Sequence, residues 1–255
     1  MSRAPVIFPS LAVALLTAGC GSTPLDAISV DPTNLPMGLV AHWTFDESGG
    51  DVVGDSSGNG HDGQLTGGAW TTAGRFEGAL EINSGAYVTV PDFPNATPNW
   101  SVSVWVYVTQ AQIDTDTGDD TGQTILSTEN VFEGGWQLHM DTRPGFRQFD
   151  AAYWAGSSDY VVAACGCIEA DRWIHLTAVF DQDRAELRFY RDDTLVDRKA
   201  MPMPILPGDS TLYFGRWNMN ARLLSATIDD FAIWSRALAS REIAALSAQP
   251  APDAR

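Results

Sequence analysis

The stretch "WSVSVWVYV", residues 100–108, constrains the fold more than any other part of the chain. Successive side chains of a β-strand point to opposite faces, so the alternate valines from Val102 to Val108 share one face. Trp105 and Tyr107 lie on the other face. A strand that is apolar on both faces is covered on both sides, so the stretch predicts a central strand of a sheet.

Similar short segments recur along the chain and are separated by glycine-rich turns. They are "LVAHWTF", "AYVTV", "GWQLHM", "WIHLTAVF", "ELRFYRD", "TLYFG" and "ATIDDFAIW". Many short strands with such turns predict an all-β fold, a two-sheet antiparallel sandwich or jelly roll. Helical spacing is found in "LASREIAAL", which predicts one short C-terminal helix. With 255 residues and 44% hydrophobic side chains, the chain is long enough for one large domain.

The balance of charge is strongly acidic, with 15 basic and 32 acidic residues and a formal net charge of −17. Binding to phosphate groups depends on clustered Lys and Arg, so this charge disfavours nucleic acid and anionic lipid headgroups as partners. It favours divalent cations and uncharged ligands. The alternative interpretation is that the acidity keeps an exported protein soluble.

The first twenty residues, "MSRAPVIFPSLAVALLTAGC", predict a targeting segment, because the apolar run is too short to span a bilayer. The ending "LLTAGC" resembles the lipobox of bacterial lipoproteins, although Thr17 stands where that motif prefers Leu. The resemblance implies that residues 1–19 are a signal peptide and that Cys20 is lipidated. The chain would then be exported and anchored to a bacterial membrane, at the outer membrane or cell surface. An ordinary secretory signal is the alternative.

Two further segments are poor in core residues. Residues 20–37 contain three prolines and predict a flexible linker, and residues 247–255 predict a disordered tail. Cys165 and Cys167 flank a single glycine in "ACGCIEA". In an oxidising compartment they can form a disulfide, with free thiols as the alternative. A metal site would need two more ligands, and none lies nearby in sequence.

Several segments together resemble the laminin-G-like, concanavalin A-like jelly-roll domains of bacterial surface proteins. They occur in the family's order between residues 38 and 246: "GLVAHWTFDESGGDVVGDSSGNGHDGQL", "GRFEGALEINSGAYVTVPD", "WSVSVWVYV", "RWIHLTAVFD", "LRFYRDD" and "TIDDFAIWSRALASREIAAL". The resemblance implies a jelly roll whose first and last strands are neighbours. The chain departs from the pattern at Asp192–Asp193, where the family has Asp-Gly, and in the acidic insert Asp114–Gly122. "ACGC" is a further addition.

Residues 45–63 are rich in Asp and Gly and suggest a structural calcium ion, because calcium prefers oxygen ligands on flexible loops. We expect Asp46 and Asp55 as ligands, and the resemblance implies a further ligand, Asp229, from the last strand. By simple alternation Asp229 would share the apolar face of Phe231, where a carboxylate needs a partner. The alternative is that turn amides satisfy these carboxylates.

Two short motifs in the acidic regions have simpler interpretations. Asn59–Gly60 predicts a type I′ hairpin turn, in which both residues have positive φ. The insert "DTDTGDD" superficially resembles an EF-hand loop, but Ile125 stands at its twelfth position, where a bidentate Glu belongs. A solvated loop is the better interpretation of the insert.

Catalysis has little support in the sequence. Related sandwiches include glucan hydrolases, and the nearest match to their paired carboxylates is "DQDRAE", with Asp181, Asp183 and Glu186. The family pattern places a hairpin turn there, so we expect solvent-facing acids. The four histidines lack zinc spacing, and no nucleophile elbow is present.

A non-catalytic binding module of the cell envelope is therefore the leading hypothesis. Sugar recognition uses exposed aromatic faces beside polar groups. We expect Tyr153, Trp154 and Trp217 to bind a polysaccharide or surface glycoconjugate, although any of these rings could instead pack in the core. The alternative function is a protein–protein adhesion or scaffold role with an envelope protein as partner.

Overall fold

The structure is a computed structural model that describes residues 35–249 except 84, 95–97, 116–121, 129–133, 144, 156–159, 209 and 219–221. The signal peptide, Cys20 and most of the predicted linker therefore lie outside the described residues, as do most of the acidic insert and the tail beyond Gln249. Among the helices of the described part, none is long and apolar enough to cross a membrane.

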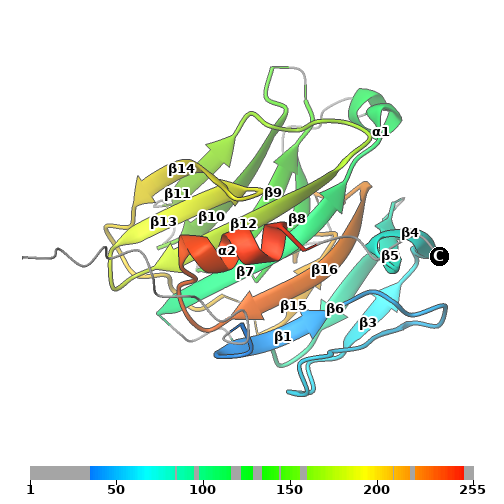
Figure 1. The fold of residues 1–255 in the computed structure, drawn as a ribbon, viewed down its shortest axis with the longest axis horizontal. Helices are drawn as coiled ribbons and strands as arrows, with labels where there is room; N and C mark the ends of the chain where they lie inside the picture. The colour runs from blue at the N-terminus through cyan, green and yellow to red at the C-terminus, as the bar shows by residue number, and fades with distance from the viewer. Residues whose placement is uncertain are drawn as a thin grey trace, which may run out of the picture. The chain divides into compact units, whose positions relative to one another are not determined.

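Within the described residues, eight strands form the first sheet, called sheet A (Figure 1). They are β1 (Leu39–Trp43), β4 (Ala69–Phe76), β5 (Gly78–Ile82), β7 (Asn99–Tyr107), β12 (Trp173–Asp181), β13 (Glu186–Arg191), β14 (Thr194–Ala200) and β16 (Ala226–Trp234). Their order is β14-β13-β12-β7-β16-β5-β4, and β1 pairs with β16 beyond the end of β5. The first and last strands are thus antiparallel neighbours, as the resemblance implied.

Sheet B also has eight strands in the part of the chain that the structure describes. They are β2 (Val52–Val53), β3 (Gly63–Thr66), β6 (Tyr87–Val90), β8 (Gln123–Ser127), β9 (Gly135–Asp141), β10 (Gln148–Trp154), β11 (Tyr160–Cys165) and β15 (Leu212–Phe214). Their order is β11-β10-β9-β8-β15-β6-β3-β2, and each of these described pairs is antiparallel. The two sheets form the antiparallel jelly-roll sandwich predicted from the sequence.

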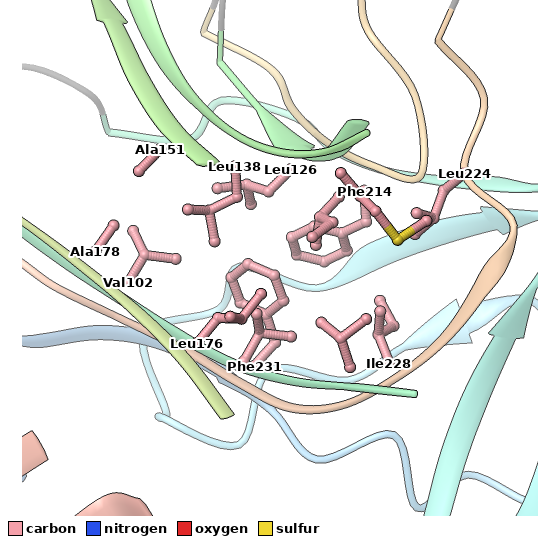
Figure 2. Close-up of a cluster of buried hydrophobic side chains, with 14 of the residues drawn as sticks. Val102, Leu126, Leu138, Ala151, Leu176, Ala178, Phe214, Leu224, Ile228 and Phe231 are labelled. Atoms are coloured by element: carbon pink, nitrogen blue, oxygen red, sulfur yellow. The ribbon is translucent and has the colours of Figure 1, made fainter. Parts of the chain in front are cut away.

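The core lies between the two sheets (Figure 2). Val102, Val104 and Val106 of β7 are fully buried and belong to this core. Val102 lies across from Leu138 of sheet B (Figure 2). Trp105, on the opposite face of β7, is only 5% exposed. Both faces of this strand are therefore covered, which confirms the prediction of a central strand.

The predicted C-terminal helix is α2 (Ser240–Ser247), which lies across the outer face of sheet A (Figure 1). Ile243 and Leu246 pack against Trp234 and Val179 in a small second core. A short helix that the sequence did not predict, α1 (Gln110–Thr115), follows β7.

The packed domain is slightly longer than residues 38–246. The indole Nε1 of Trp234 donates to the Leu35 carbonyl at 2.7 Å, and Nε of Arg236 donates to the Met37 carbonyl at 2.6 Å. At the other end, Nη2 of Arg75 donates to the Gln249 carbonyl at 2.9 Å. Backbone carbonyls at the inner ends of the predicted linker and tail therefore bind side chains of the domain.

The prediction that Asp229 shares the face of Phe231 was wrong. The pairing of β16 with β7 shifts between Asp229 and Ala232, and Asp230 has a φ of +48°. Such a bulge breaks the period of two. Phe231 points into the core, whereas Asp229 is the cross-strand partner of Trp105 on the outer side.

Candidate functional site

The carboxylate of Asp55 organises the acidic loop between β2 and β3. Its Oδ1 accepts the backbone N–H groups of His42 and Ser57 at 3.0 and 2.9 Å, and its Oδ2 accepts the N–H of His61 at 2.9 Å. Burial favours a raised pKa, but these hydrogen bonds outweigh it and lower the pKa of Asp55 below its ordinary value. Both carboxylate oxygens are therefore satisfied by amides, which was the alternative to calcium binding at this residue.

The type I′ turn predicted at Asn59–Gly60 is not formed. Gly58 and Gly60 have positive φ values of 84° and 81°, but Asn59 is not among the residues with positive φ. Its side-chain amide instead donates to the Leu39 and Val40 carbonyls at 3.1 and 2.9 Å. The loop is thus fixed to β1 by side chains instead of by a two-residue turn.

Asp46 and Asp229 both bind the connection between β4 and β5. Oδ1 of Asp46 accepts the N–H of Gly78 at 2.8 Å, and Oδ2 of Asp229 accepts the N–H of Phe76 at 2.9 Å. Asp229 is fully buried, which raises its pKa to about 7. Its Oδ1 has no hydrogen-bond partner among the described residues.

The three predicted calcium ligands do not come together as one set. Asp46 and Asp229 lie at the β4–β5 connection, whereas Asp55 is held by the loop amides after β2. Within the described ranges, no group of three or more His, Cys, Asp or Glu side chains is arranged to hold a metal ion. The residues present therefore do not fit the predicted three-aspartate cage.

The predicted aromatic ligand residues have three different environments. Tyr153 is fully buried in the core, where its ring meets Phe180 edge-on at 6.4 Å, so its prediction as an exposed platform was wrong. Trp154 is half-buried and stacks on Tyr160 at 4.8 Å. Trp217 is half-buried under the guanidinium of Arg222, 4.6 Å away. Neighbouring residues of a strand face opposite sides, which explains why Tyr153 and Trp154 differ.

A continuous row of cross-strand partners crosses the outer face of sheet B. In order, it contains Gln64, Thr89, Tyr213, Ser127, Gln137, Ala152 and Val162. The residues between these positions, such as Val88, Phe214 and Leu138, belong to the core. The row therefore points away from sheet A.

Several polar side chains in and beside this row are buried although they point away from the core, and Ser127 of the row is one of them. Thr124, Gln137, His139 and Asp150 are between 0 and 8% exposed and are called the polar floor. His139 Nδ1 lies 3.3 Å from Asp150 Oδ2. The Thr124 hydroxyl and the Gln137 Oε1 have no hydrogen-bond partner among the described residues. Buried polar atoms without partners are costly, so each of these two atoms would gain from an additional polar partner such as a water molecule.

The polar floor has well-defined borders. Gly122, at the end of the acidic insert, lies so close to His139 that an added Cβ would be 2.3 Å from its Cε1. The Leu206 N–H donates to the Trp154 carbonyl at 3.4 Å, so the chain before β15 follows the end of β10. Beside Tyr213, the guanidinium of Arg216 lies over the rings of Tyr87 and Tyr213 at 4.0 and 4.7 Å.

Sequence reasoning missed the polar floor. The signal was present in "GWQLHM", where Gln137 and His139 alternate with apolar core residues. Alternation shows only that such residues face outward, and Asp150 becomes their neighbour through the pairing of β9 with β10. Neither fact indicates that an outward-facing polar residue will be buried.

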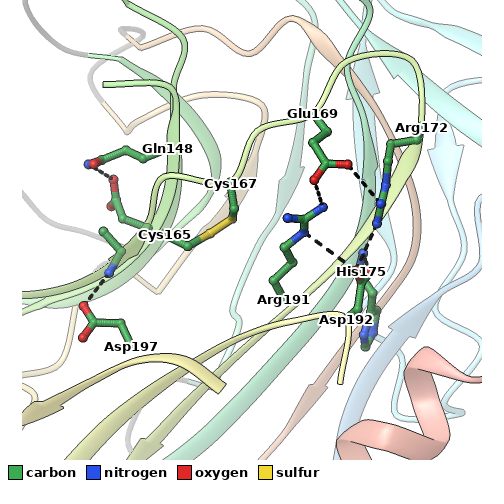
Figure 3. The surroundings of a disulfide bond; sticks show 11 residues. Gln148, Cys165, Cys167, Glu169, Arg172, His175, Arg191, Asp192 and Asp197 are labelled. Atoms are coloured by element: carbon green, nitrogen blue, oxygen red, sulfur yellow. Dashed lines mark hydrogen bonds and ion pairs between the residues drawn. A yellow bond between two sulfur atoms is a disulfide. The ribbon is translucent and has the colours of Figure 1, made fainter. Parts of the chain in front are cut away.

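A disulfide joins Cys165, the last residue of β11, to Cys167, as predicted (Figure 3). Next to it, Glu169 forms ion pairs with Arg172 and Arg191. These contacts fix the turn that returns the chain from the edge of sheet B to β12 in sheet A.

The stretch most similar to hydrolase carboxylates is a hairpin turn, as predicted. Asp181 and Glu186 are cross-strand partners that close the β12–β13 hairpin. Asp181 does not face solvent, however, because it is only 1% exposed. Its Oδ2 forms ion pairs with Nη1 of Arg184 at 2.9 Å and with Nη2 of Arg188 at 3.3 Å. Its carboxylate is therefore used to hold the turn.

A serine and a histidine also meet on the outer face of sheet A. Ser103 Oγ lies 2.7 Å from Nε2 of His175, and both residues are almost fully buried. Burial lowers the pKa of His175 to about 4. Its Nδ1 has no partner within the described ranges, so no carboxylate orients the ring as in a catalytic triad. The pair serves packing and hydrogen bonding under the helix.

A family model described as the concanavalin A-like lectin/glucanases superfamily, of laminin-G type, matches residues 83–244. The chain belongs to this superfamily. The matched residues include β6 to β13 and the last strand β16, and thus most of both sheets. A search among curated proteins finds no match.

Solved structures with a similar fold include receptor-binding domains of botulinum neurotoxins. The serotype D ligand-binding domain in complex with N-acetylneuraminic acid has a TM-score of 0.65 and 16% identity, covering 85% of this chain and 52% of that chain. The receptor-binding domain of the C/D mosaic serotype has a TM-score of 0.65 and 14% identity, covering 84% of this chain and 51% of that chain. The serotype G binding domain has a TM-score of 0.62 and 16% identity, covering 82% of this chain and 50% of that chain. The chain spans about half the length of these proteins, and the likeness concerns the fold.

Proposed function

We propose that this member of the superfamily is a non-catalytic carbohydrate-binding module and that the outer face of sheet B holds the ligand. The observation that carries the proposal is the polar floor. Thr124 and Gln137 offer buried polar atoms without partners, and both lie beside the His139–Asp150 pair. Sugar hydroxyls donate and accept hydrogen bonds at once, so they suit a floor of mixed donors and acceptors.

Aromatic side chains on both sides of the floor add an apolar contact surface. Tyr160 is 57% exposed and stacks on Trp154 at one end, and half-buried Tyr213 lies at the other. Sugar rings combine apolar C–H faces with polar edges, and an aromatic ring packs against such a face. The combination of ring and polar floor supports a carbohydrate over an apolar ligand.

The similar neurotoxin domain that was solved with N-acetylneuraminic acid supports the choice of glycans as the first ligands to test. The net charge of −17 favours neutral glycans for this chain. An acidic glycan therefore belongs in the same experiment as a comparison.

Native affinity electrophoresis through gels containing single polysaccharides tests the proposal. The chain expressed from residue 21 retains every described residue and is suitable for it. We expect retardation by at least one neutral polysaccharide among xylan, β-glucan, mannan and starch, and at least tenfold weaker binding after Trp154→Ala. The matched control is Phe146→Ala, which removes an aromatic ring that is 54% exposed outside the row and its neighbours. Retention of full binding by Trp154→Ala would reject this face.

A protein partner is the competing function, as an adhesion or scaffold module. If no polysaccharide retards the chain, and one envelope protein is captured specifically through the outer face of sheet B beside Tyr160, the adhesion or scaffold function would be favoured over carbohydrate binding.

The remaining part of the proposal is export and lipid anchoring. It is supported by the lipobox-like "LLTAGC" and the acylation site Cys20 in it. One acyl chain gives weak membrane binding and several give stable anchoring. Mass spectrometry of the mature N-terminus tests this point: we expect an acylated Cys20, and an unmodified Cys20 or cleavage elsewhere would reject it.

A bound calcium ion remains a prediction from the sequence, but Asp46, Asp55 and Asp229 do not form one ligand set for it. Asp46 and Asp229 lie at the same connection, so an ion bound there would also need backbone carbonyls. Isothermal titration with millimolar calcium tests it. Heat and a higher melting temperature that both disappear in Asp46→Asn would support the ion, and no heat would reject it.

A further inference from the structure

The outer face of sheet A carries a second row of cross-strand partners. In order, it contains Ala69, Glu81, Thr227, Tyr107 and Trp173. The neighbouring rows are covered. The row of Trp105 lies under Phe76 and Arg75, and the row of Trp234 lies under α2. The row of Trp173 is half-exposed.

A hollow of about 350 Å³ lies along this row. Tyr107 and Trp173 form part of its lining, with ring centroids 5.5 Å apart and planes at 54°. Thr71 and Glu81 line it from the β4–β5 side, and Gln112 of α1 is also part of the lining. Small-molecule sites have volumes of about 300 to 1,000 Å³, so the hollow suits a ligand of one or two rings.

The chemistry of the lining restricts the ligand. The two aromatic rings provide an apolar surface, while Thr71, Thr227 and Gln112 provide polar groups at its margin. The Tyr107 hydroxyl and the Trp173 indole N–H have no hydrogen-bond partner among the described residues. Glu81 is the charged residue of the lining, and Oε1 already accepts from Asn83 Nδ2 at 2.9 Å.

We infer that this hollow is a second carbohydrate-binding site and that it takes a neutral sugar. A neutral pyranose stacks on the Trp173 and Tyr107 rings and hydrogen-bonds to the free Tyr107 hydroxyl and indole N–H. The Glu81 carboxylate accepts from sugar hydroxyls and repels sialic acid, uronic acids and sulfated sugars, since no basic side chain lines the described hollow.

Two sites on opposite outer faces of the sandwich make the chain bivalent, and this part of the inference rests on the proposed function of sheet B. One short oligosaccharide cannot reach both faces, so two sites would bind two glycan chains or two distant parts of one polymer. Bivalent attachment raises the apparent affinity for a polymer without new contacts.

Isothermal titration with cellohexaose, maltohexaose, xylohexaose and mannohexaose, with sialyllactose as the acidic comparison, tests the second site. In the Trp154→Ala background, we expect one remaining neutral site, which Trp173→Ala weakens at least tenfold. Thr227→Arg fills the hollow without removing a core side chain and should have the same effect. The matched control, Leu195→Ala, removes an apolar side chain that is 38% exposed on the edge strand β14 of the same sheet.

The outcomes separate the two proposals. Neutral-sugar binding that is lost in Trp173→Ala and in Thr227→Arg, and kept in Leu195→Ala, supports the second site. Binding that disappears completely with Trp154→Ala overturns the second site and leaves the first intact. Equal affinity for sialyllactose, or unchanged titrations in both hollow variants, also overturns it.

Discussion

The two outer faces of this sandwich differ in what covers them. On sheet A, α2 and the β4–β5 connection lie over the strands, and the buried polar groups beneath them are only partly paired. Ser103 binds His175, whereas His175 Nδ1 and Asp229 Oδ1 have no partner among the described residues. On sheet B, buried polar groups remain without partners, notably on Thr124 and Gln137. A paired buried group stabilises the fold, whereas an unpaired one lowers stability and calls for a ligand or water. The comparison teaches that both faces hold buried polar atoms without partners, so binding measurements on variants of each face are needed to identify the one that takes a ligand.

The largest expected effect comes from opening the cover of sheet A. Trp234 is 2% exposed and packs against α2, and its indole N–H also donates a hydrogen bond to the Leu35 carbonyl. Removing so large a buried side chain costs about 3–5 kcal/mol. Trp234→Ala should lower the free energy of unfolding by that amount in urea denaturation. Glycan binding by the folded fraction should be unchanged, and a loss of binding at sheet B would break the distinction between the faces.

The next effect is a pH dependence located on sheet A. Burial lowers the pKa of His175 to about 4, so the folded protein holds it neutral while the unfolded chain binds a proton below pH 6.5. Stability should therefore fall as the pH falls from 6.5 to about 4, by about 3 kcal/mol for this group. Urea denaturation across this range should show a smaller acid loss in His175→Gln. An unchanged profile would contradict the assigned burial.

Asp229 should act in the opposite direction. Its folded pKa of about 7 lies above the ordinary value of 3.8, so ionisation destabilises the fold as the pH rises from about 4 to 7. Asp229→Asn should be more stable than the natural chain at pH 8 and nearly equal to it at pH 4. Thermal melts at the two pH values measure the difference. Destabilisation at pH 8 would instead indicate that the carboxylate binds a cation.

A smaller effect is expected where the two sheets are joined. Asp55 lies in the loop between β2 and β3 of sheet B and accepts the N–H of His42 in β1 of sheet A. Loss of its hydrogen bonds in Asp55→Ala should cost about 2 kcal/mol, since bonds to a charged acceptor contribute about 1.5–3 kcal/mol. The loss should be the same in EDTA and in calcium. A loss confined to calcium-containing buffer would restore Asp55 as an ion ligand.

Much of this fold could be predicted, because burial imposes a period that the residues show directly. The valines of β7 and the helix α2 follow their patterns. Asp229 did not, because one bulge residue reverses the faces of a strand and leaves no mark in composition. The environment of Asp55 could not be predicted for a related reason: its carboxylate binds nearby amides that any sequence offers.

The candidate site could be predicted only in part. Trp154 stays a prediction, as a half-buried aromatic residue beside polar ones. Tyr153 next to it was misplaced because the phase of the strand was unknown. The polar floor depends on three strands, β8, β9 and β10, whose register is set by pairing. Sequence order alone cannot bring Thr124, His139 and Asp150 together.

The most direct test of the central claim measures stability and binding together in Gln137→Leu. This substitution keeps the volume of a 6% exposed side chain and removes the Oε1 atom that has no partner in the described structure. Removing an unsatisfied buried polar group is neutral or stabilising. The account predicts an equal or higher melting temperature together with a glycan affinity at least tenfold lower. Unchanged glycan binding, or a marked loss of stability, would contradict it.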